Sequence, residues 1–339
     1  MILIDTLYLN SFGGKTILEL FIQNILISET KHHFLLDSRL DSKLVMKLNP
    51  CNYTIIEATH KNRVDFYSQY LITFSCILCL SNVPPPLHTS TKTFIFFHNC
   101  LFLNPLSHPI SFKSQIINFF KLNYIKYYNQ NDYNWIVQTP YMYKLLRKNL
   151  IINSEQVFIY PIFKEKSKSS STKKIINNFV YVSSAVSHKN HKRLVKAFIE
   201  AANKADKVIT LHLTLNKEDL TENIYPKNLK VKFHGTLSRD SVNKLYDSCD
   251  FAIYPSLVES FGLPLIEAAN HGCKVIASNL PYVHEIILPS LTFNPYSVES
   301  MSNSILKALE SKNLPETNVL VKNKLNNFID SIISQNVQK

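Results

Sequence analysis

Residues 254–276 read YPSLVESFGLPLIEAANHGCKVI and contain, in order, the end of a strand, a loop, a helix and the start of another strand. The apolar run FAIY stops at Pro255, and helical spacing follows over residues 263–271. Pro264 falls in the first turn of that helix, where proline is favoured, and Gly272 is placed to close it as a C-terminal cap. The stretch predicts a strand–turn–helix unit whose free helix N–H groups face the loop.

The same alternation extends along the whole chain. From Asn178 onward, short β-rich runs (NFVYVSS, VITLHLTL, KVKFHG, FAIYPS, KVIASN) alternate with helical periods at 191–202, 239–248, 263–271 and 298–309. The first half repeats the pattern less regularly, with MILIDTLYL, HHFLLD, YTIIE, TFIFFHN, NWIVQT and VFIYPIF as strands. Such βαβ series form parallel sheets that bind ligands at the carboxyl ends of their strands. The predicted fold class is α/β, with two Rossmann-like doubly wound domains.

A polar, Ser-rich stretch divides the two halves. It reads KEKSKSSSTKK over residues 164–174, a composition that buries nothing and is typical of a linker. We therefore predict an N-terminal domain at 1–163, a linker at 164–176 and a C-terminal domain at 177–314. Residues 315–339 keep helical spacing and are expected to form a helix that packs back across the domains.

Composition excludes several classes of protein. The chain has 339 residues, of which 45% are hydrophobic and 18% charged. The longest apolar run, residues 70–80, is too short to span a membrane, and the amino terminus has no basic leader, so we expect a cytoplasmic protein. Six cysteines are too few for a disulfide framework, and Cys76 and Cys79 lie in an apolar run, which favours core packing over redox or zinc chemistry.

The chain is basic, with a net charge of +12 from 37 Lys and Arg against 25 Asp and Glu. This excess favours an anionic partner such as a nucleotide, a nucleic acid or a membrane surface. Only five of the 37 are Arg, so the patches typical of nucleic-acid readers are not expected.

Glycine is rare, with five in the chain. Each is expected where a Cβ is not tolerated. Gly262 stands directly before the helix of the opening stretch, where a close backbone approach and free helix N–H groups would make an anion site. Glu259 precedes it in the loop and Glu267 follows in the helix, so both carboxylates can reach one crevice.

The segment ESFGLPLIEA followed by HGCKVIAS resembles the E-x7-E signature of retaining glycosyltransferases of the GT-B fold, particularly family 4, also called glycosyl transferases group 1. The preceding FHGTLSRDSVNKLYDSCDFAIYPS is similar to that family's strand, Gly-containing loop, helix and strand. The resemblance covers residues 179–309 and is diffuse in the first half. It implies two Rossmann-like domains that face a cleft.

The resemblance implies a role for each matching residue. Glu259 would be catalytic, facing the donor sugar, and Glu267 would bind the ribose of the nucleotide. Sugar and diphosphate would lie against backbone amides of the loop and the helix start, at Phe261, Gly262, Leu263 and Pro264. The main chain beside the nucleobase would belong to Thr236 and Leu237.

Lys189, in SSAVSHKNHKRL, matches the family lysine that neutralises the donor diphosphate. This charge is needed because the leaving nucleoside diphosphate gains charge as the glycosidic bond breaks. The family often has an arginine five residues earlier, where this chain has Ser184. Arg193 or His188 could compensate in this phosphate clamp, and a solvated helix-start lysine is the alternative for Lys189 itself.

Two features of the first half match the family less specifically. Gly13 and Gly14 correspond to a glycine pair in a loop at the cleft, although a simple tight turn is the alternative. His98 ends the strand TFIFFHN and resembles a histidine that contacts the sugar and assists catalysis, although a lone histidine is more often structural.

The helical stretch IINFFKLNYIKYY, residues 116–128, has apolar residues on one face beside Lys121 and Lys126. These residues are Ile116, Ile117, Phe120, Tyr124 and Tyr127. The face either rests on an anionic membrane or packs into the core of the first domain.

The function predicted from these features is a retaining glycosyltransferase. It would move a hexose from a UDP- or GDP-linked nucleotide-sugar to a hydroxyl of a lipid-linked surface glycan, at the inner face of the cell membrane. No cofactor, no metal and no nucleic acid are expected. The alternatives are a degenerate, non-catalytic relative that binds sugar nucleotides, and an epimerase or phosphorylase of the same fold.

Overall fold

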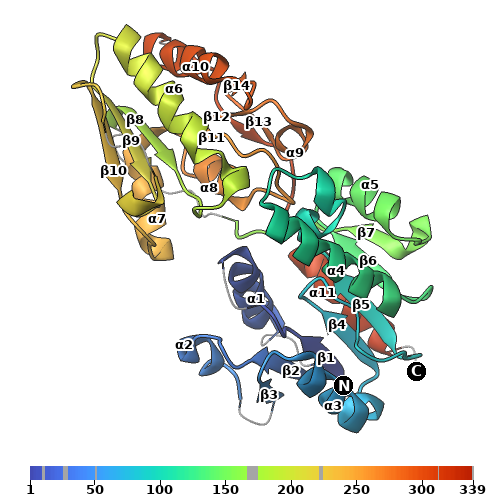
Figure 1. The fold of residues 1–339 in the computed structure, drawn as a ribbon. Coiled ribbons are helices and arrows are strands. Elements are labelled where there is room, and N and C mark those ends of the chain that lie inside the picture. The colour runs from blue at the N-terminus through green and yellow to red at the C-terminus, as the bar shows by residue number, and fades with distance from the viewer. Residues whose placement is uncertain are drawn as a thin grey trace. The chain divides into compact units, whose positions relative to one another are not determined.

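The computed structural model of the chain describes residues 1–9, 12–25, 30–49, 52–165, 175–220, 224–311 and 313–337. They group into two compact units. The first unit holds residues 1–106, 115–165 and 322–339, and the second holds residues 107–114 and 166–321. The chain therefore enters the second unit once, briefly, before the predicted linker, and it returns to the first unit at its carboxyl end (Figure 1).

The first unit is built on a sheet of seven parallel strands. In spatial order the strands are β3 (Tyr53–Ile56), β2 (His32–Asp37), β1 (Ile2–Asp5), β4 (Cys76–Cys79), β5 (Lys92–Phe96), β6 (Asn134–Val137) and β7 (Val157–Ile159). The order 3-2-1-4-5-6 is that of a Rossmann sheet, extended here by one strand. The chain order reverses between β1 and β4, which makes their carboxyl ends the expected ligand-binding edge.

The helices of the first unit are α1 (Phe12–Ile25), α2 (Ser42–Val45), α3 (His60–Tyr70), α4 (Phe112–Tyr128), α5 (Pro140–Asn149) and α11 (Leu325–Val337). The first three residues of α4 belong to the second unit. Helix α11 completes the core: the ring of Phe328 lies 5.3 Å from that of Phe21 and 6.0 Å from that of Phe96. The last segment of the chain is thus part of the first unit's hydrophobic core.

The second unit repeats the design with six parallel strands. Their order is β10 (Leu229–Phe233), β9 (Ile209–Leu213), β8 (Ile175–Tyr181), β11 (Cys249–Tyr254), β12 (Lys274–Ser278) and β14 (Leu291–Phe293). A small antiparallel pair is formed by β13 (Ile287–Leu288) and β15 (Asn318–Val319). The reversal of strand order falls between β8 and β11, and loops from their carboxyl ends meet there.

The helices of the second unit are α6 (His191–Lys204), α7 (Arg239–Ser248), α8 (Leu263–Asn270), α9 (Pro281–His284) and α10 (Val298–Glu310). Helices α6 and α10 lie side by side (Figure 1). Phe198 of α6 packs edge-on against Phe179 of β8, with ring centroids 5.1 Å apart. Of the helices in the described ranges, none has both the length and the hydrophobicity needed to cross a bilayer.

The predicted α/β class with two Rossmann-like doubly wound domains is confirmed. The sequence did not reveal β4, a strand of only four residues inside the apolar run of residues 70–80, or α3, whose sequence HKNRVDFYSQY is mostly polar. Cys76 and Cys79 are buried and free on β4, as predicted for core residues, and burial raises the pKa of each thiol to about 12. Residues 166–174, most of the predicted linker, lie outside the described residues, and β8 begins at Ile175.

Candidate functional site

The opening stretch folds as the sequence predicts. Strand β11 ends at Tyr254, a loop follows, and α8 begins at Leu263 with Pro264 in its first turn. Gly262 precedes the helix with φ of 76°, in the left-handed region, and a Cβ there would stand 3.1 Å from Cδ1 of Leu265. Gly272 ends the helix with φ of 69°. The turn therefore requires the conformational freedom of glycine at both ends of α8.

Lys189 and Glu259 form an ion pair at the edge where β8 and β11 end. Lys189 ends a short 3₁₀ turn, Ser187–Lys189, in the loop after β8. Its Nζ lies 2.5 Å from Oε1 of Glu259, and the two side chains are 15% and 12% exposed. Because β8 and β11 are neighbouring parallel strands, two residues 70 positions apart meet at one edge. The structure thus brings together two of the predicted site residues.

Neighbouring groups fix the two loops around this pair. The backbone N–H of Leu257 donates to the carbonyl of His188 at 2.8 Å. Asn190, in the left-handed conformation with φ of 64°, donates from its buried amide to the carbonyls of Pro255 and Pro295. Burial raises the pKa of Glu259, but Lys189 outweighs it, and the net pKa lies below the ordinary value. Glu259 is therefore an anion at neutral pH.

The hydroxyl of Tyr254 donates to Oε1 of Glu259 at 3.0 Å. We did not identify this tyrosine from the sequence, because it reads as the last residue of a strand. Its burial raises the pKa of the phenol well above the ordinary value, so it remains a neutral donor. Tyr254 and Lys189 together orient the Glu259 carboxylate.

The second glutamate also has a cationic partner. Glu267 projects from α8, and Nη2 of Arg239 lies 3.1 Å from its Oε1. Burial raises the pKa of Glu267, and Arg239 offsets part of that rise. Arg239 is one of only five arginines in the chain and opens α7, a signal that the sequence offered and that we did not use.

The loop predicted to lie beside a nucleobase follows β10. Gly235 has φ of 61°, and a Cβ on it would stand 2.9 Å from Oδ1 of Asn216. Thr236 is exposed and Leu237 half-buried, directly before α7. The rings of His212 and His234 stack next to this loop, with centroids 5.2 Å apart and a nitrogen–nitrogen distance of 2.9 Å.

The two residues predicted to complete a phosphate clamp have other partners. Ser184 accepts from the backbone N–H of Val186 through its carbonyl, within the loop after β8. Arg193 donates from Nη1 to Oδ1 of Asn190 at 2.9 Å, and its guanidinium lies 6.0 Å from the ring centroid of Tyr296. Their part in phosphate binding stays a prediction.

In the first unit, His98 and Gly14 are neighbours. His98 follows β5; its Nε2 lies 3.1 Å from both the side-chain amide of Asn82 and the carbonyl of Leu80. Burial lowers its pKa to about 4, so the imidazole is neutral at pH 7. Gly13 and Gly14 lie within the first turn of α1 instead of in a loop, because that helix already begins at Phe12. A Cβ on Gly14 would stand 2.7 Å from Cδ2 of Leu9 and 4.0 Å from Cε1 of His98.

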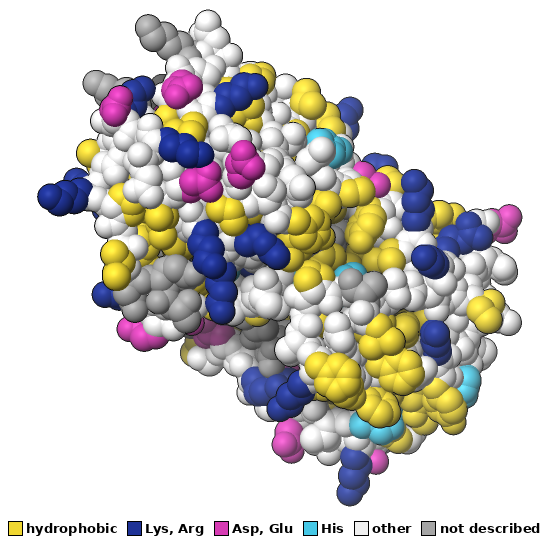
Figure 2. All heavy atoms as spheres, turned by 45° about the horizontal axis from the view of Figure 1, so that its top comes forward, with side chains coloured by type: hydrophobic (Ala, Val, Ile, Leu, Met, Phe, Trp, Pro, Cys, Tyr) yellow, Lys and Arg dark blue, Asp and Glu magenta, His cyan; other side chains and the backbone are white. Residues whose placement is uncertain are grey.

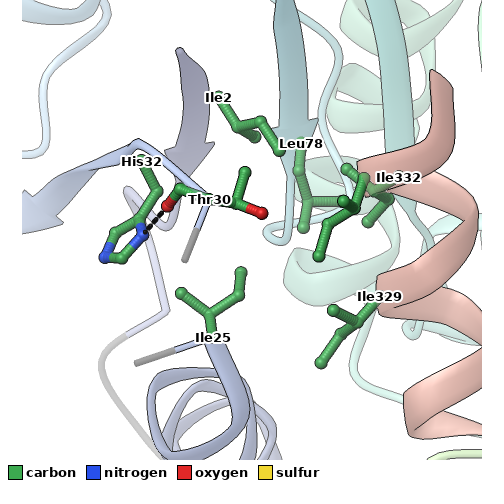
Figure 3. A pocket seen from close by; sticks show the side chains of 8 residues that line it. Ile2, Ile25, Thr30, His32, Leu78, Ile329 and Ile332 are labelled. Carbon is green, nitrogen blue, oxygen red and sulfur yellow. Dashed lines mark hydrogen bonds between the residues drawn. The ribbon is translucent and has the colours of Figure 1, made fainter. Parts of the chain in front are cut away.

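The first unit also contains a small apolar pocket, which lies apart from the predicted residues. Figure 3 shows the side chains of Ile2, Ile25, Leu78, Ile329 and Ile332 around one space, between the strands and α11. His32 binds the carbonyl of Thr30 through Nδ1 at 2.8 Å. This lining lacks the cations and carboxylates that a sugar nucleotide requires. Within the described ranges, no three His, Cys, Asp or Glu side chains come together as metal ligands.

Comparison with known proteins places this arrangement in a family. Residues 162–324 match the family model described as Glycosyl transferases group 1. This stretch, just under half of the chain, is similar to that family. The predicted resemblance to glycosyl transferases group 1 is thereby confirmed for this part of the chain, which includes both members of the Lys189–Glu259 and Arg239–Glu267 pairs.

Curated proteins to which the chain is similar include bacterial mannosyltransferases. The chain is 37% identical over 78 residues to the serotype-specific mannosyltransferase WbdA of Escherichia coli, which covers 23% of this chain and 10% of that protein. It is 27% identical over 163 residues to the O-antigen chain mannosyltransferase RfbU of Salmonella typhimurium, covering 47% and 46%. The chain thus matches less than half the length of these relatives.

Solved structures match over both units. HepE from Anabaena, in complex with UDP-glucose, superposes with a TM-score of 0.64 at 14% identity and covers 91% of this chain and 89% of that one. A glycosyltransferase from Rickettsia africae gives 0.62 at 18% identity, with 91% and 87% covered. The chain therefore has the GT-B fold predicted for it, and most of the stretch that matches glycosyl transferases group 1 lies in the second unit.

Proposed function

We propose that the chain is a retaining glycosyltransferase that transfers a hexose from a UDP- or GDP-linked donor to a hydroxyl acceptor. The observation that supports this best is the Lys189–Glu259 pair at the start of α8, a cation and an anion held together where the strand order reverses. A sugar nucleotide needs both: a cation for its diphosphate and a carboxylate for its sugar hydroxyls.

Each group has a defined part in this reaction. Lys189 and the free N–H groups at the start of α8 would bind the diphosphate. We propose that these groups neutralise its negative charge without a metal or a cofactor. Glu259, ionised and held by Tyr254, would accept hydrogen bonds from sugar hydroxyls. Glu267 would bind the ribose, and the backbone at Thr236 and Leu237 the base.

Retention of configuration is proposed to follow from displacement on one face of the sugar. The bond between the anomeric carbon and the diphosphate oxygen breaks, and the acceptor oxygen bonds to the same face. The acceptor's proton passes to the departing diphosphate oxygen, so no protein nucleophile is required. Glu259 would then orient and stabilise the sugar. A part for His98 in catalysis is proposed from its match to the family alone.

Melting-temperature shifts with UDP, GDP, ADP and their hexose conjugates test the donor. A ligand at 100 times its dissociation constant adds about 2.7 kcal/mol to the stability of the native state. We expect one nucleotide to give a selective shift in melting temperature, and we expect Lys189→Ala to abolish this shift. Lys204→Ala, which removes a lysine from an exposed ion pair on α6, is the control and should retain it. No shift with any nucleotide in the folded protein would favour the degenerate relative over the enzyme.

Turnover tests catalysis separately from binding. Glu259→Gln keeps the shape of the side chain but removes its charge, and we expect kcat to fall by at least about 100-fold while the nucleotide still binds. Unchanged turnover would contradict the assignment. Products formed without a glycan acceptor would instead indicate an epimerase or a phosphorylase.

The relatives' names contain O-antigen, and we propose a lipid-linked glycan as acceptor, reached at an anionic membrane. Helix α4 supports this because Ile116, Ile117, Phe120 and Tyr127 are 40%, 43%, 67% and 72% exposed, whereas Leu122 and Ile125 face the core. Tyr124, the fifth residue of the predicted face, is half-buried against His60, so the face is exposed at four of its five residues. Lys121 and Lys126 lie on the same helix, and Figure 2 shows hydrophobic patches with Lys and Arg between them.

Liposome flotation tests the membrane proposal. We expect the protein to float with anionic vesicles and to lose this with Ile117→Ser and Phe120→Ser together. Ile72→Ser, which removes a 94% exposed apolar side chain elsewhere, is the matched control. Absence from both anionic and neutral vesicle fractions would contradict the proposal.

A further inference from the structure

The two glutamates of the site each meet a cation from a different loop. Lys189 reaches Glu259 from the loop after β8, and Arg239 reaches Glu267 from the start of α7. The family resemblance predicted both Lys189 and Glu259 as site residues. It did not predict Arg239. Its partner Glu267 is the carboxylate proposed to bind the ribose, so the contact lies inside the proposed nucleotide site.

Arg239 is fixed at its backbone as well as at its guanidinium. Ser238 caps α7 by accepting the backbone N–H of Ser241 at 3.3 Å, so the first helical residue, Arg239, has a set position. The residues just before the cap, Gly235 to Leu237, form the loop proposed to lie beside the base. Arg239 therefore ties this loop to the α8 carboxylate through one hydrogen bond of 3.1 Å.

The contact differs from an ordinary surface pair. Lys204 and Glu200 are four residues apart on α6, with side chains 50% and 34% exposed. Arg239 and Glu267 are 28 residues apart, on two different helices, and their side chains are 38% and 27% exposed. A carboxylate at this depth needs an opposite charge to stay ionised, and a guanidinium fixes the plane of the carboxylate it contacts.

We propose that Arg239 is a positioning residue for the nucleoside: it holds Oε1 of Glu267 so that the carboxylate faces the donor's ribose. This inference rests on the proposed function. Arg239 acts through Glu267, and it takes no part in the chemistry at the anomeric carbon, which Glu259 and Lys189 surround.

Calorimetric titration with the nucleoside diphosphate that the wild-type protein binds, and with its 2′,3′-dideoxy form, tests the proposal. We expect Arg239→Ala to weaken the ribonucleotide about 5- to 20-fold, because a charged hydrogen bond that orients the ribose carboxylate is lost. The dideoxy nucleotide should bind equally to the wild type and to Arg239→Ala, because it lacks the ribose hydroxyls that would donate hydrogen bonds to Glu267. The donor KM should rise by the same factor, with kcat nearly unchanged.

Arg239→Lys keeps the positive charge but not the planar guanidinium, and we expect it to recover part of the ribonucleotide affinity. This variant also tests the proposal if Arg239→Ala folds poorly. Lys204→Ala should bind as the wild type does. Equal ribonucleotide affinity in Arg239→Ala and wild type, or an equal loss for the dideoxy nucleotide, would overturn the inference. Failure of the wild type to bind any nucleotide would instead overturn the proposed function.

Discussion

The hydroxyl of Tyr254 and Nζ of Lys189 both donate to one oxygen of Glu259, Oε1, at 3.0 and 2.5 Å. Tyr254 ends β11, and Glu259 lies five residues further, so the strand's last side chain supports the loop that follows it. The carboxylate is thus oriented from the strand and neutralised from the neighbouring loop. Glu259 has a fixed direction before any ligand arrives.

Tyr254→Phe removes one of these two donors and nothing else. We expect kcat to fall about 3- to 10-fold, because the carboxylate keeps its charge but loses part of its orientation, at a cost of about 1 kcal/mol. Steady-state kinetics measures this. Tyr143→Phe, in the first unit beside Arg147, is the control and should behave as the wild type. A Tyr254→Phe enzyme with wild-type kcat would show that Lys189 alone orients Glu259.

Glu267→Gln is expected to stabilise the protein at neutral pH while it weakens nucleotide binding. Burial raises the folded-state pKa of Glu267 above the unfolded value, so the folded state holds the proton more tightly. Its contribution to stability is therefore largest below the unfolded pKa and declines as the pH rises through the folded pKa. We expect a rise in Tm on the order of 2 °C at pH 7 and none at pH 4, measured by thermal melts. A lower Tm at both pH values would contradict this.

Gly262→Ala is expected to destabilise the second unit by about 1–2 kcal/mol, because alanine at φ of 76° meets its own carbonyl and approaches Leu265. Denaturant titration gives the free energy of unfolding. Gly262→Asn should cost less, since asparagine tolerates the left-handed region. If both variants unfold like the wild type, the turn does not depend on the glycine.

Arg63→Met tests a buried pair in the first unit. Nη2 of Arg63 lies 2.8 Å from Oδ2 of Asp5, and both side chains are fully buried. Nη1 of Arg63 also donates to the carbonyl of Pro84 at 2.8 Å. Removing the guanidinium leaves the Asp5 carboxylate buried without its charge partner, which should cost about 3–5 kcal/mol of unfolding free energy.

The double variant Asp5→Asn with Arg63→Met is expected to recover part of this loss, because no charge then remains buried. Chemical denaturation of the two variants and the wild type makes the comparison. A double variant less stable than Arg63→Met alone would show that the Asp5 oxygens, which also accept from Tyr67 and Leu7, matter through those bonds instead.

The sequence alone determined the elements whose signals are local. The strand–turn–helix over residues 254–276 depends on an apolar run, Gly262, Pro264 and Gly272, each acting within a few residues, so its bounds could be predicted. The same holds for α7, which runs from Arg239 to Ser248 as its periodicity indicates. The family resemblance rests on the same local stretch.

Only the tertiary structure decided which side chains meet. Lys189 and Glu259 are 70 residues apart and Arg239 and Glu267 are 28 apart, and each pair forms because parallel strands or neighbouring helices bring distant loops to one edge. Strand β4 was not predicted, since a four-residue strand within an apolar run of eleven residues cannot be told from part of a buried helix until its neighbours are known. The exposure of the α4 aromatic face was equally undecided, because one amphipathic pattern fits either a core or an open surface until the neighbours are known.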